Sequence, residues 1–231
     1  MIGIIGAMDE EVAMLKEKLT EVQVETKAAM DFYKGKLEGK DVVVVRSGIG
    51  KVNAAMCAQI LADIYHADHV INTGIAGSLK AEINIGDIVL STDALQHDMD
   101  ATGFGYEPAE IPLMGKKTFE ADASLRSLIA ETCREVNPEI GVFEGRVVSG
   151  DQFISDGDVK DRLVRMFAPY CTEMEGAAIA QAAWLNQIPF VIIRAISDKA
   201  DGSAHMDYSE FEAKAIEHTV RLEEAAAAKH A

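Results

Sequence analysis

Short apolar runs rich in β-branched residues recur along the chain, and segments with helical spacing lie between them. The runs cover residues 2–5, 42–45, 70–74, 147–150 and 190–195. Strands of this kind that alternate with helices are typical of a mostly parallel sheet covered on both faces. The pattern therefore predicts an α/β fold, in which a central, mostly parallel mixed β-sheet is covered by helices in an αβα arrangement.

The segments between these runs complete the predicted organisation. Residues 8–19 are predicted to be helical because Met8, Val12, Leu15 and Leu19 share one apolar stripe. We also expect two strands over 21–38, a helix from the glycine loop at 47–50 to about residue 65, and a last helix over 208–229. No repeat or linker interrupts the chain, so residues 1–231 are predicted to form a single domain. The irregular stretch 99–117 is long enough to indicate a functional loop or an interface.

The charge of the chain excludes some classes of partner. The sequence has 38 Asp and Glu against 22 Lys and Arg, a formal net charge of −16. Such a surface repels polyanions, so nucleic acids and anionic membranes are not expected partners. Hydrophobic residues make up 48% of the chain, which argues against a disordered acidic protein.

Several features indicate a cytoplasmic protein. The longest apolar runs, such as 42–45 and 190–193, fall far short of the roughly 20 residues that span a bilayer. The apolar N-terminal segment lacks the cationic region of a signal peptide. Cys57, Cys133 and Cys171 are odd in number and widely spaced, which fits neither a disulfide framework nor a zinc site.

Glycine, serine and acidic residues follow the predicted strands, at the edge where parallel sheets bind ligands. The segment from Gly3 to Met8 lacks the dinucleotide-binding spacing, and the loop from Ser47 to Lys51 lacks that of a P-loop. No cofactor is therefore expected. The histidines have no partner motif for a metal, and no nucleophile elbow indicates a serine hydrolase.

Carboxylates are the candidate chemical groups. Glu11 lies in an acidic first helical turn, where complementing the helix dipole is an alternative role. Glu173 and Glu175 are two residues apart, so on a helix only one of them would face a pocket. Asp198 ends a buried strand, where it is either a helix cap or a catalytic acid.

Six segments together resemble one family. They are, in chain order, Gly-Ile-Ile-Gly-Ala-Met-Asp-Glu-Glu-Val from Gly3, Ser-Gly-Ile-Gly-Lys from Ser47, Asn-Thr-Gly from Asn72, Val-Ser-Gly-Asp-x-Phe-Ile from Val148, Glu-Met-Glu-Gly-Ala from Glu173 and Arg-Ala-Ile-Ser-Asp from Arg194. The chain resembles, over essentially its whole length, the bacterial 5′-methylthioadenosine/S-adenosylhomocysteine nucleosidases of the nucleoside phosphorylase/hydrolase superfamily. The resemblance implies a phosphorylase/hydrolase-like αβα domain, a cytosolic homodimer and no cofactor.

The implied activity is hydrolysis of the N-glycosidic bond of 5′-methylthioadenosine and S-adenosylhomocysteine, with 5′-deoxyadenosine as a further candidate substrate. Adenine and a 5-thioribose are the products, which places the enzyme in methionine salvage and in the recycling of S-adenosylmethionine by-products. The resemblance assigns Asp198 as the acid that serves adenine N7, Glu11 as the base that activates water, and Glu175 as the ligand of the ribose hydroxyls.

The resemblance also implies a set of substrate-binding residues. The set comprises Gly77, Ile154, Glu173 and Met174 along the purine and sugar, Phe153 stacked on adenine, Met8, Ile49 and Tyr208 at the 5′-alkylthio group, and Phe104, Tyr106 and Pro112 reaching the pocket from the partner subunit. One residue departs from the pattern, because relatives commonly carry Ser where this chain has Ile75. A polar contact near the ribose or the water is expected to be lost or replaced there.

Three alternatives remain open at this stage. A phosphate-dependent nucleoside phosphorylase would need cations near the anomeric carbon, for which Arg46 and Arg194 are the candidates. Acids follow the first strand instead, and a carboxylate there would repel phosphate. A futalosine-type hydrolase would act on a related nucleoside. A catalytically silent nucleoside-binding module is the third alternative, against which the three retained carboxylates argue.

Overall fold

The computed structural model describes residues 1–202 and 204–229, with side chains described for 1–202 and 216–229. The strands are β1 (Ile2–Gly6), β2 (Thr20–Lys27), β3 (Met30–Leu37), β4 (Lys40–Arg46), β5 (His69–Ser78), β6 (Ile88–Gln96), β7 (Phe119–Glu120), β8 (Val142–Ser149), β9 (Cys171–Glu173) and β10 (Phe190–Asp198). The helices are α1 (Asp9–Lys18), α2 (Lys51–Asp63), the short 3-10 helix η1 (Thr102–Phe104), α3 (Ala123–Val136), α4 (Gly157–Phe167), α5 (Gly176–Leu185) and α6 (Ala204–Lys229).

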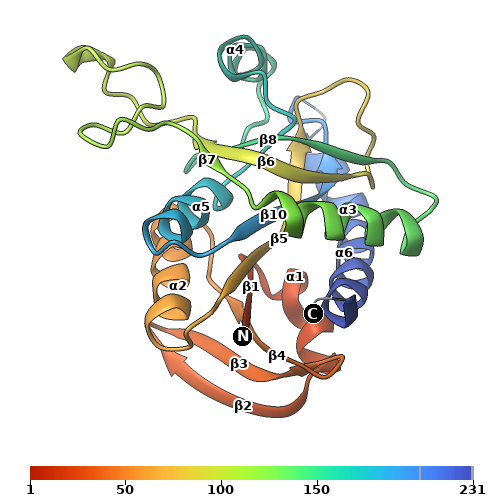
Figure 1. The fold of residues 1–231 in the computed structure, drawn as a ribbon. Helices are drawn as coiled ribbons and strands as arrows, with labels where there is room; N and C mark the ends of the chain where they lie inside the picture. The colour runs from red at the N-terminus through yellow and green to blue at the C-terminus, as the bar shows by residue number, and fades with distance from the viewer. Residues whose placement is uncertain (203, 230–231) are drawn as a thin grey trace.

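The strands form one mixed sheet, which confirms the predicted α/β class (Figure 1). Its centre is parallel, because β4, β1, β5 and β10 all run in the same direction. Antiparallel pairs add β3 and β2 beyond β4, where they form an edge of the sheet, and attach the short β7 to β6. β10 pairs with both β5 and β6, so β5, β10, β6, β8 and β9 form a closed circuit of hydrogen-bonded strands.

Helices cover both faces of the sheet. α1, α3 and α6 pack against one face, and α2 and α5 against the other (Figure 1). Strand β4 shows why, because successive side chains of a strand point to opposite faces. Val42 and Val44 join the core under α1 and α6, whereas Val43 and Val45 join the core under α2 and α5. All four are fully buried, and each such valine contributes about 1.5–3 kcal/mol to stability.

The predicted elements are found, with shifts at their ends. The helix predicted over 8–19 and the two strands predicted over 21–38 are α1 and the β2–β3 hairpin. β5 continues past Gly74 to Ser78, because glycine tolerates the φ of +155° at this position and its missing side chain leaves room for Arg194 and Glu11. The last helix begins at Ala204, four residues before its predicted start. The sequence patterns did not single out β6, β7, β9, α3 or α4.

The irregular stretch 99–117 projects from the sheet between β6 and β7 (Figure 1). We call residues 99–117 the arm. Its side chains include Phe104, which is 89% exposed, and Leu113, which is 97% exposed. Ala109, by contrast, is buried and anchors the arm to the body. Within the described part of the chain, none of the helices has the length and hydrophobicity of a membrane-spanning segment.

Candidate active site

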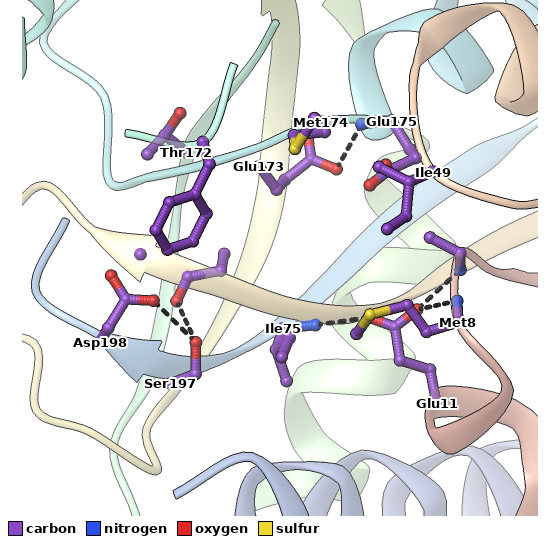
Figure 2. Close-up of a pocket in the computed structure, with 14 residues that line it drawn as sticks. Met8, Glu11, Ile49, Ile75, Thr172, Glu173, Met174, Glu175, Ser197 and Asp198 are labelled. Carbon is purple, nitrogen blue, oxygen red and sulfur yellow. Dashed lines mark hydrogen bonds between the residues drawn. The ribbon is translucent and has the colours of Figure 1, made fainter. Parts of the chain in front are cut away.

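A cavity of about 410 Å³ opens at the carboxyl ends of β1, β5 and β10, beside the turn from β9 into α5 (Figure 2). Ligands bind at this edge in open α/β sheets because the loops there leave a crevice. The lining residues are Ala7, Met8, Glu11, Ile49, Ile75, Ala76, Gly77, Phe153, Thr172, Glu173, Met174, Glu175, Ser197 and Asp198. Glu11, Glu175 and Asp198 thus surround one space, although more than 180 positions separate the first from the last.

Glu11 points back from α1 toward the ends of the strands, whereas its neighbours Asp9 and Glu10 are exposed. One carboxylate oxygen accepts hydrogen bonds from the backbone N–H groups of Ala7 and Met8, at 2.7 and 3.1 Å. The other accepts from the N–H of Ile75 on β5, at 3.2 Å. The first two bonds also cap the helix, but the third ties Glu11 to the sheet.

Burial raises the pKa of the Glu11 carboxyl, and the Arg194 charge and the three backbone hydrogen bonds act against that rise. The net effect is a raised pKa, so the Glu11 carboxyl takes up a proton more readily than a free glutamate does. A carboxyl in that condition suits general-base chemistry.

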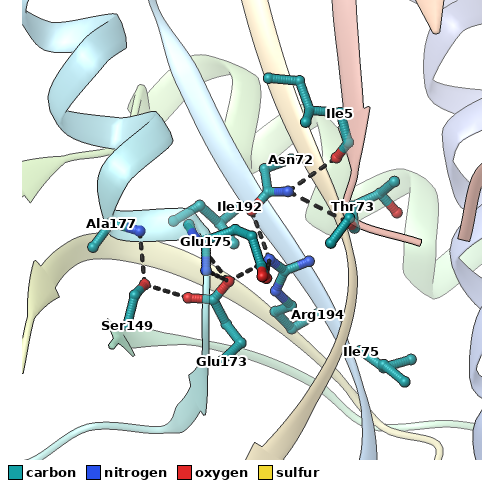
Figure 3. Close-up of polar contacts among 12 residues, drawn as sticks. Ile5, Asn72, Thr73, Ile75, Ser149, Glu173, Glu175, Ala177, Ile192 and Arg194 are labelled. Carbon is teal, nitrogen blue, oxygen red and sulfur yellow. Dashed lines mark hydrogen bonds and ion pairs between the residues drawn. The ribbon is translucent and has the colours of Figure 1, made fainter. Parts of the chain in front are cut away.

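Glu173 and Glu175 both line the cavity, so the expectation that only one of them would face a pocket is wrong. Neither residue is within a helix, because β9 ends at Glu173 and α5 begins at Gly176. The Glu173 carboxylate pairs with Arg194, accepts from the Ser149 hydroxyl, and accepts from the N–H groups of Glu175 and Gly176 (Figure 3). Glu173 therefore fixes the start of α5.

Glu175 is less fully paired than Glu173. Its carboxylate accepts from the Gly50 N–H at 2.8 Å and lies 3.8 Å from the Arg194 guanidinium. Burial, together with the charge of Glu173, raises the pKa of Glu175 to about 7. The glycine loop after β4 thus serves the site through a backbone N–H, as an anchor for a carboxylate.

Asp198 ends β10 and is 2% exposed. Its carboxylate accepts from the Ser197 hydroxyl at 2.9 Å and from the Ala200 N–H at 2.7 Å. Gly77 on the paired strand β5 allows this approach, because a side chain at Gly77 would collide with the Asp198 carboxylate. Asp198 thus caps the turn that follows β10, as the alternative role predicted, but it does not cap α6, which begins only at Ala204.

The other predicted binding residues divide into three groups. Met8, Ile49, Gly77, Phe153 and Met174 line the cavity with Glu173, and Ile154 lines a small extension of it beside Phe153. Phe104, Tyr106 and Pro112 lie on the arm and do not line the cavity of their own chain. The side chain of Tyr208 lies outside the described residues.

Arg194 has a role that the sequence patterns did not identify. The only charged residue of the run Phe190–Ile196 is fully buried, and its guanidinium bonds Glu173 and the Asn72 side chain, the latter at 2.7 Å (Figure 3). The sequence could have indicated this role, because Arg194 is a single cation inside an apolar strand, and a buried cation requires anionic partners. Ser197 was also overlooked as a lining residue.

Ile75 stands where relatives commonly carry Ser, and the structure shows what it does there. Its backbone N–H holds Glu11, while its apolar side chain lines the cavity on the side of β5 that faces away from Arg194 (Figure 3). Any residue except proline could supply that hydrogen bond. The substitution therefore leaves the position of Glu11 intact.

Arg46 and Arg194 were the candidate ligands for a phosphate, and neither of them lines the cavity. Arg194 is bonded as described, and the half-exposed Arg46 pairs with Asp9 at 3.3 Å. Among the described side chains, no three His, Cys, Asp or Glu residues are grouped so as to hold a metal ion.

Comparison with known proteins adds family evidence to this geometry. The model of the phosphorylase superfamily matches residues 1–228. A 5′-methylthioadenosine/S-adenosylhomocysteine nucleosidase of Bacillus thuringiensis (strain Al Hakam) is 42% identical over 225 residues, covering 96% of this chain and 95% of that protein. The structure of the nucleosidase of the same name from Neisseria meningitidis, in complex with methylthio-immucillin-A, has a TM-score of 0.95 at 35% identity and covers 99% of each chain. A futalosine hydrolase of Helicobacter pylori is similar at a TM-score of 0.93 and 30% identity, covering 99% of this chain and 97% of that one.

Proposed function

This chain belongs to the 5′-methylthioadenosine/S-adenosylhomocysteine nucleosidases of the phosphorylase superfamily, and we propose that Asp198, Glu11 and Glu175 carry out its reaction. The enzyme is an N-glycosidase that acts on methylthioadenosine and adenosylhomocysteine and releases adenine. The proposal concerns which side chains perform each step. It is supported by the convergence of the three carboxylates on one cavity.

The reaction breaks the bond between the anomeric carbon and the purine, and the bonding electron pair leaves with adenine. In the proposed mechanism Asp198 gives a proton to adenine N7, which makes the purine a better leaving group. Glu11 removes a proton from the water that attacks the anomeric carbon. Glu175 stays ionised near the ribose and stabilises the positive charge that develops on the sugar. The products are adenine and the 5-thioribose.

The charge of the cavity lining supports water as the nucleophile. Four of the described lining residues are acids, namely Glu11, Glu173, Glu175 and Asp198. The described lining contains no Lys, Arg or His. Phosphate would meet carboxylates at the anomeric carbon without a facing cation. A sugar cation would be stabilised in the same place.

Glu11→Gln tests the base assignment. We expect the variant to release adenine from methylthioadenosine at least about 100-fold more slowly than the wild type, since a positioned base contributes about 10²–10⁴ to the rate. Adenine release is measured without and with inorganic phosphate, and the sugar product is identified. The wild type should give free methylthioribose without phosphate.

Glu10→Gln is the matched control, because this exposed neighbour on α1 loses the same charge outside the cavity. Near-normal release by Glu11→Gln would remove Glu11 from the mechanism. A sugar 1-phosphate formed only with phosphate would contradict hydrolysis, and faster turnover of futalosine or aminofutalosine would reassign the preferred substrate.

We further propose that the enzyme is a homodimer in which Phe104, Tyr106 and Pro112 of one subunit complete the 5′-alkylthio pocket of the other. The arm supports this assembly, because Phe104 and Leu113 are almost fully exposed and large exposed apolar groups mark interaction sites. Ile49, at the mouth of the cavity, is also 54% exposed. A partner's aromatic ring would cover this open side.

Phe104→Ala tests the dimer. We expect the KM for methylthioadenosine to rise about tenfold, which corresponds to about 1.4 kcal/mol of lost contact, with kcat less affected. Light scattering after gel filtration should show a dimer for the wild type. Val24→Ala, which truncates an exposed residue on the distant edge strand β2, is the control. A fully active monomer would contradict the shared pocket.

Two broader proposals complete the assignment. We propose a cytoplasmic location, supported by Cys57, Cys133 and Cys171, which are free and buried thiols. We also propose that residues 1–231 act as one domain, because β1 lies between β4 and β5 while β10 pairs with β5 and β6. Strands from both halves of the chain thus share one sheet.

A further inference from the structure

Glu223 is a buried acid that the proposed mechanism does not use. It lies on α6 and is 1% exposed. Neither oxygen of its carboxyl group has a hydrogen-bond partner among the described residues, and the same holds for the neighbouring hydroxyl of Thr73 on β5. Unpaired polar atoms in a protein core are costly and rare, so two of them side by side call for an explanation.

Glu223 lies behind the part of β5 that holds the proposed base. Side chains alternate along a strand, so Thr73 and Ile75 face α6, while Asn72 faces Arg194 on the other side of the sheet (Figure 3). Ile75, two residues after Thr73, gives its N–H to Glu11. Between them, Gly74 leaves a gap that Glu11 and Arg194 occupy. A shift of the β5 backbone at Thr73 would therefore also shift Gly74 and Ile75, and with them the N–H group that holds the Glu11 carboxylate.

The charged and titratable groups around Glu223 come from every element packed on it. Burial raises the pKa of Glu223 to about 8; the Thr73 hydroxyl and the Arg194 charge on β10 lower it, and the Glu11 charge on α1 raises it further. Helix α3 packs on α6, and among its described residues the buried titratable group is the thiol of Cys133. The group is thus held neutral at pH 7 beside an acid that must ionise.

We propose that Glu223 is a positioning residue for Glu11, which as a neutral acid supports the Thr73–Ile75 stretch of β5 and which releases that stretch when it ionises. The proposal rests on the role proposed above for Glu11. A neutral Glu223 carboxyl can donate its O–H toward the Thr73 hydroxyl, whereas the carboxylate can only accept from that hydroxyl, so ionisation reverses the direction in which the two groups can bond. An ionised Glu223 also repels the Glu11 carboxylate across β5, and the Arg194 charge acts against that repulsion.

The direction of the rate change separates this role from simple electrostatics. If the geometry stayed fixed, a second negative charge behind Glu11 would strengthen the base and favour the sugar cation, so the rate would rise above pH 8. If Glu11 is displaced, the rate falls, because an error of about 1 Å in a reacting group costs up to about 100-fold.

The test is the pH profile of single-turnover adenine release from methylthioadenosine, for the wild type and Glu223→Gln. Gln keeps a hydrogen-bond donor and cannot ionise. We expect the wild-type rate to fall about tenfold or more above pH 8 and the Glu223→Gln rate to remain on a plateau. Both should share the decline below about pH 7, where Glu175 takes up a proton. Glu224→Gln, which removes the next acid on α6, should follow the wild type.

A readout independent of activity follows from linkage. Since the folded state raises the pKa of Glu223, it keeps a proton that the unfolded chain releases, and stability falls as the pH rises from about 4.5 toward 8. The unfolding midpoint of Glu223→Gln relative to that of the wild type should therefore increase between pH 5 and pH 8. The Glu224→Gln difference should stay constant.

The outcomes are distinguishable. A Glu223→Gln profile that keeps the alkaline decline, or a wild-type rate that rises above pH 8, would overturn the positioning role. A Glu223→Gln rate that is lower than the wild-type rate by the same factor at every pH would also overturn it, because it would show that Glu223 only fills space in the core. If Glu11→Gln is active while Glu223→Gln behaves as expected in the stability experiment, Glu11 is not the base, but Glu223 is still a buried acid that is neutral in the folded protein.

Discussion

Asp198→Asn is expected to lower the rate of adenine release by at least about 10³-fold while the fold is retained. Asn has the shape of Asp and can still accept the Ala200 N–H, but it has no proton to give to the purine. A general acid contributes about 10²–10⁴ to the rate, and adenine is a poor leaving group without protonation. The measurement is single-turnover adenine release from methylthioadenosine, with thermal unfolding as the check on the fold.

Asp201→Asn is the matched control for this experiment. Asp201 lies three residues further along the chain, is partly exposed and lies 3.7 Å from Lys160. We expect it to keep wild-type rates. An Asp198→Asn enzyme within tenfold of the wild type would show that another group protonates the purine.

Arg194→Met is expected to lower the free energy of unfolding by about 3–5 kcal/mol, because removal of one partner leaves buried carboxylates uncompensated. Arg194 faces Glu173 and Glu175 and adds its charge to Glu11. Without the cation these acids must take up protons or be hydrated, and either change disturbs the site. Urea unfolding at pH 7 measures the loss.

The control is Arg126→Met, which removes an arginine whose partner Glu144 is partly exposed. Surface pairs of this kind are worth about 0–1 kcal/mol, so a small effect is expected. A loss below about 1 kcal/mol for Arg194→Met would mean that the acids of the site stay satisfied without the arginine. Adenine release by both variants would then show whether the cation matters for chemistry alone.

The sheet and the positions of the strand ends could be predicted because continuous β-branched runs such as Val42–Val45 have few other stable environments. The family resemblance, rather than the spacing of residues, assigned Glu11, Glu175 and Asp198 to one site, and all three line the same cavity. Strand β9, in contrast, is only three residues long and gives no periodicity to detect. The same short strand explains the error at Glu173 and Glu175, which precede the helix that the pattern assigned to them.

Contacts between distant residues lay beyond the sequence patterns. The pairing of Arg194 with Glu173, and the bond from Gly50 to Glu175, depend on how β10, β9 and the glycine loop meet. Local spacing carries no information about such meetings. The same holds for Glu223, which in sequence is one of two adjacent glutamates on a helix. Only the packing of α6 on β5 distinguishes it from Glu224, which is partly exposed and pairs with Lys18.

The closed circuit of β5, β10, β6, β8 and β9 has a mechanical consequence. Asp198 on β10 and Glu173 on β9 belong to a ring of strands in which every member is braced on both sides. Glu11 lies outside this ring, on helix α1. Its carboxylate is joined to the ring by the hydrogen bond that the Ile75 N–H of β5 donates. Asp198 and Glu173 are thus held by the ring of strands, whereas Glu11 is held by a separate helix. The separation of Glu11 from Asp198 therefore depends on how α1 packs against the sheet, through the buried Val12 and Leu15.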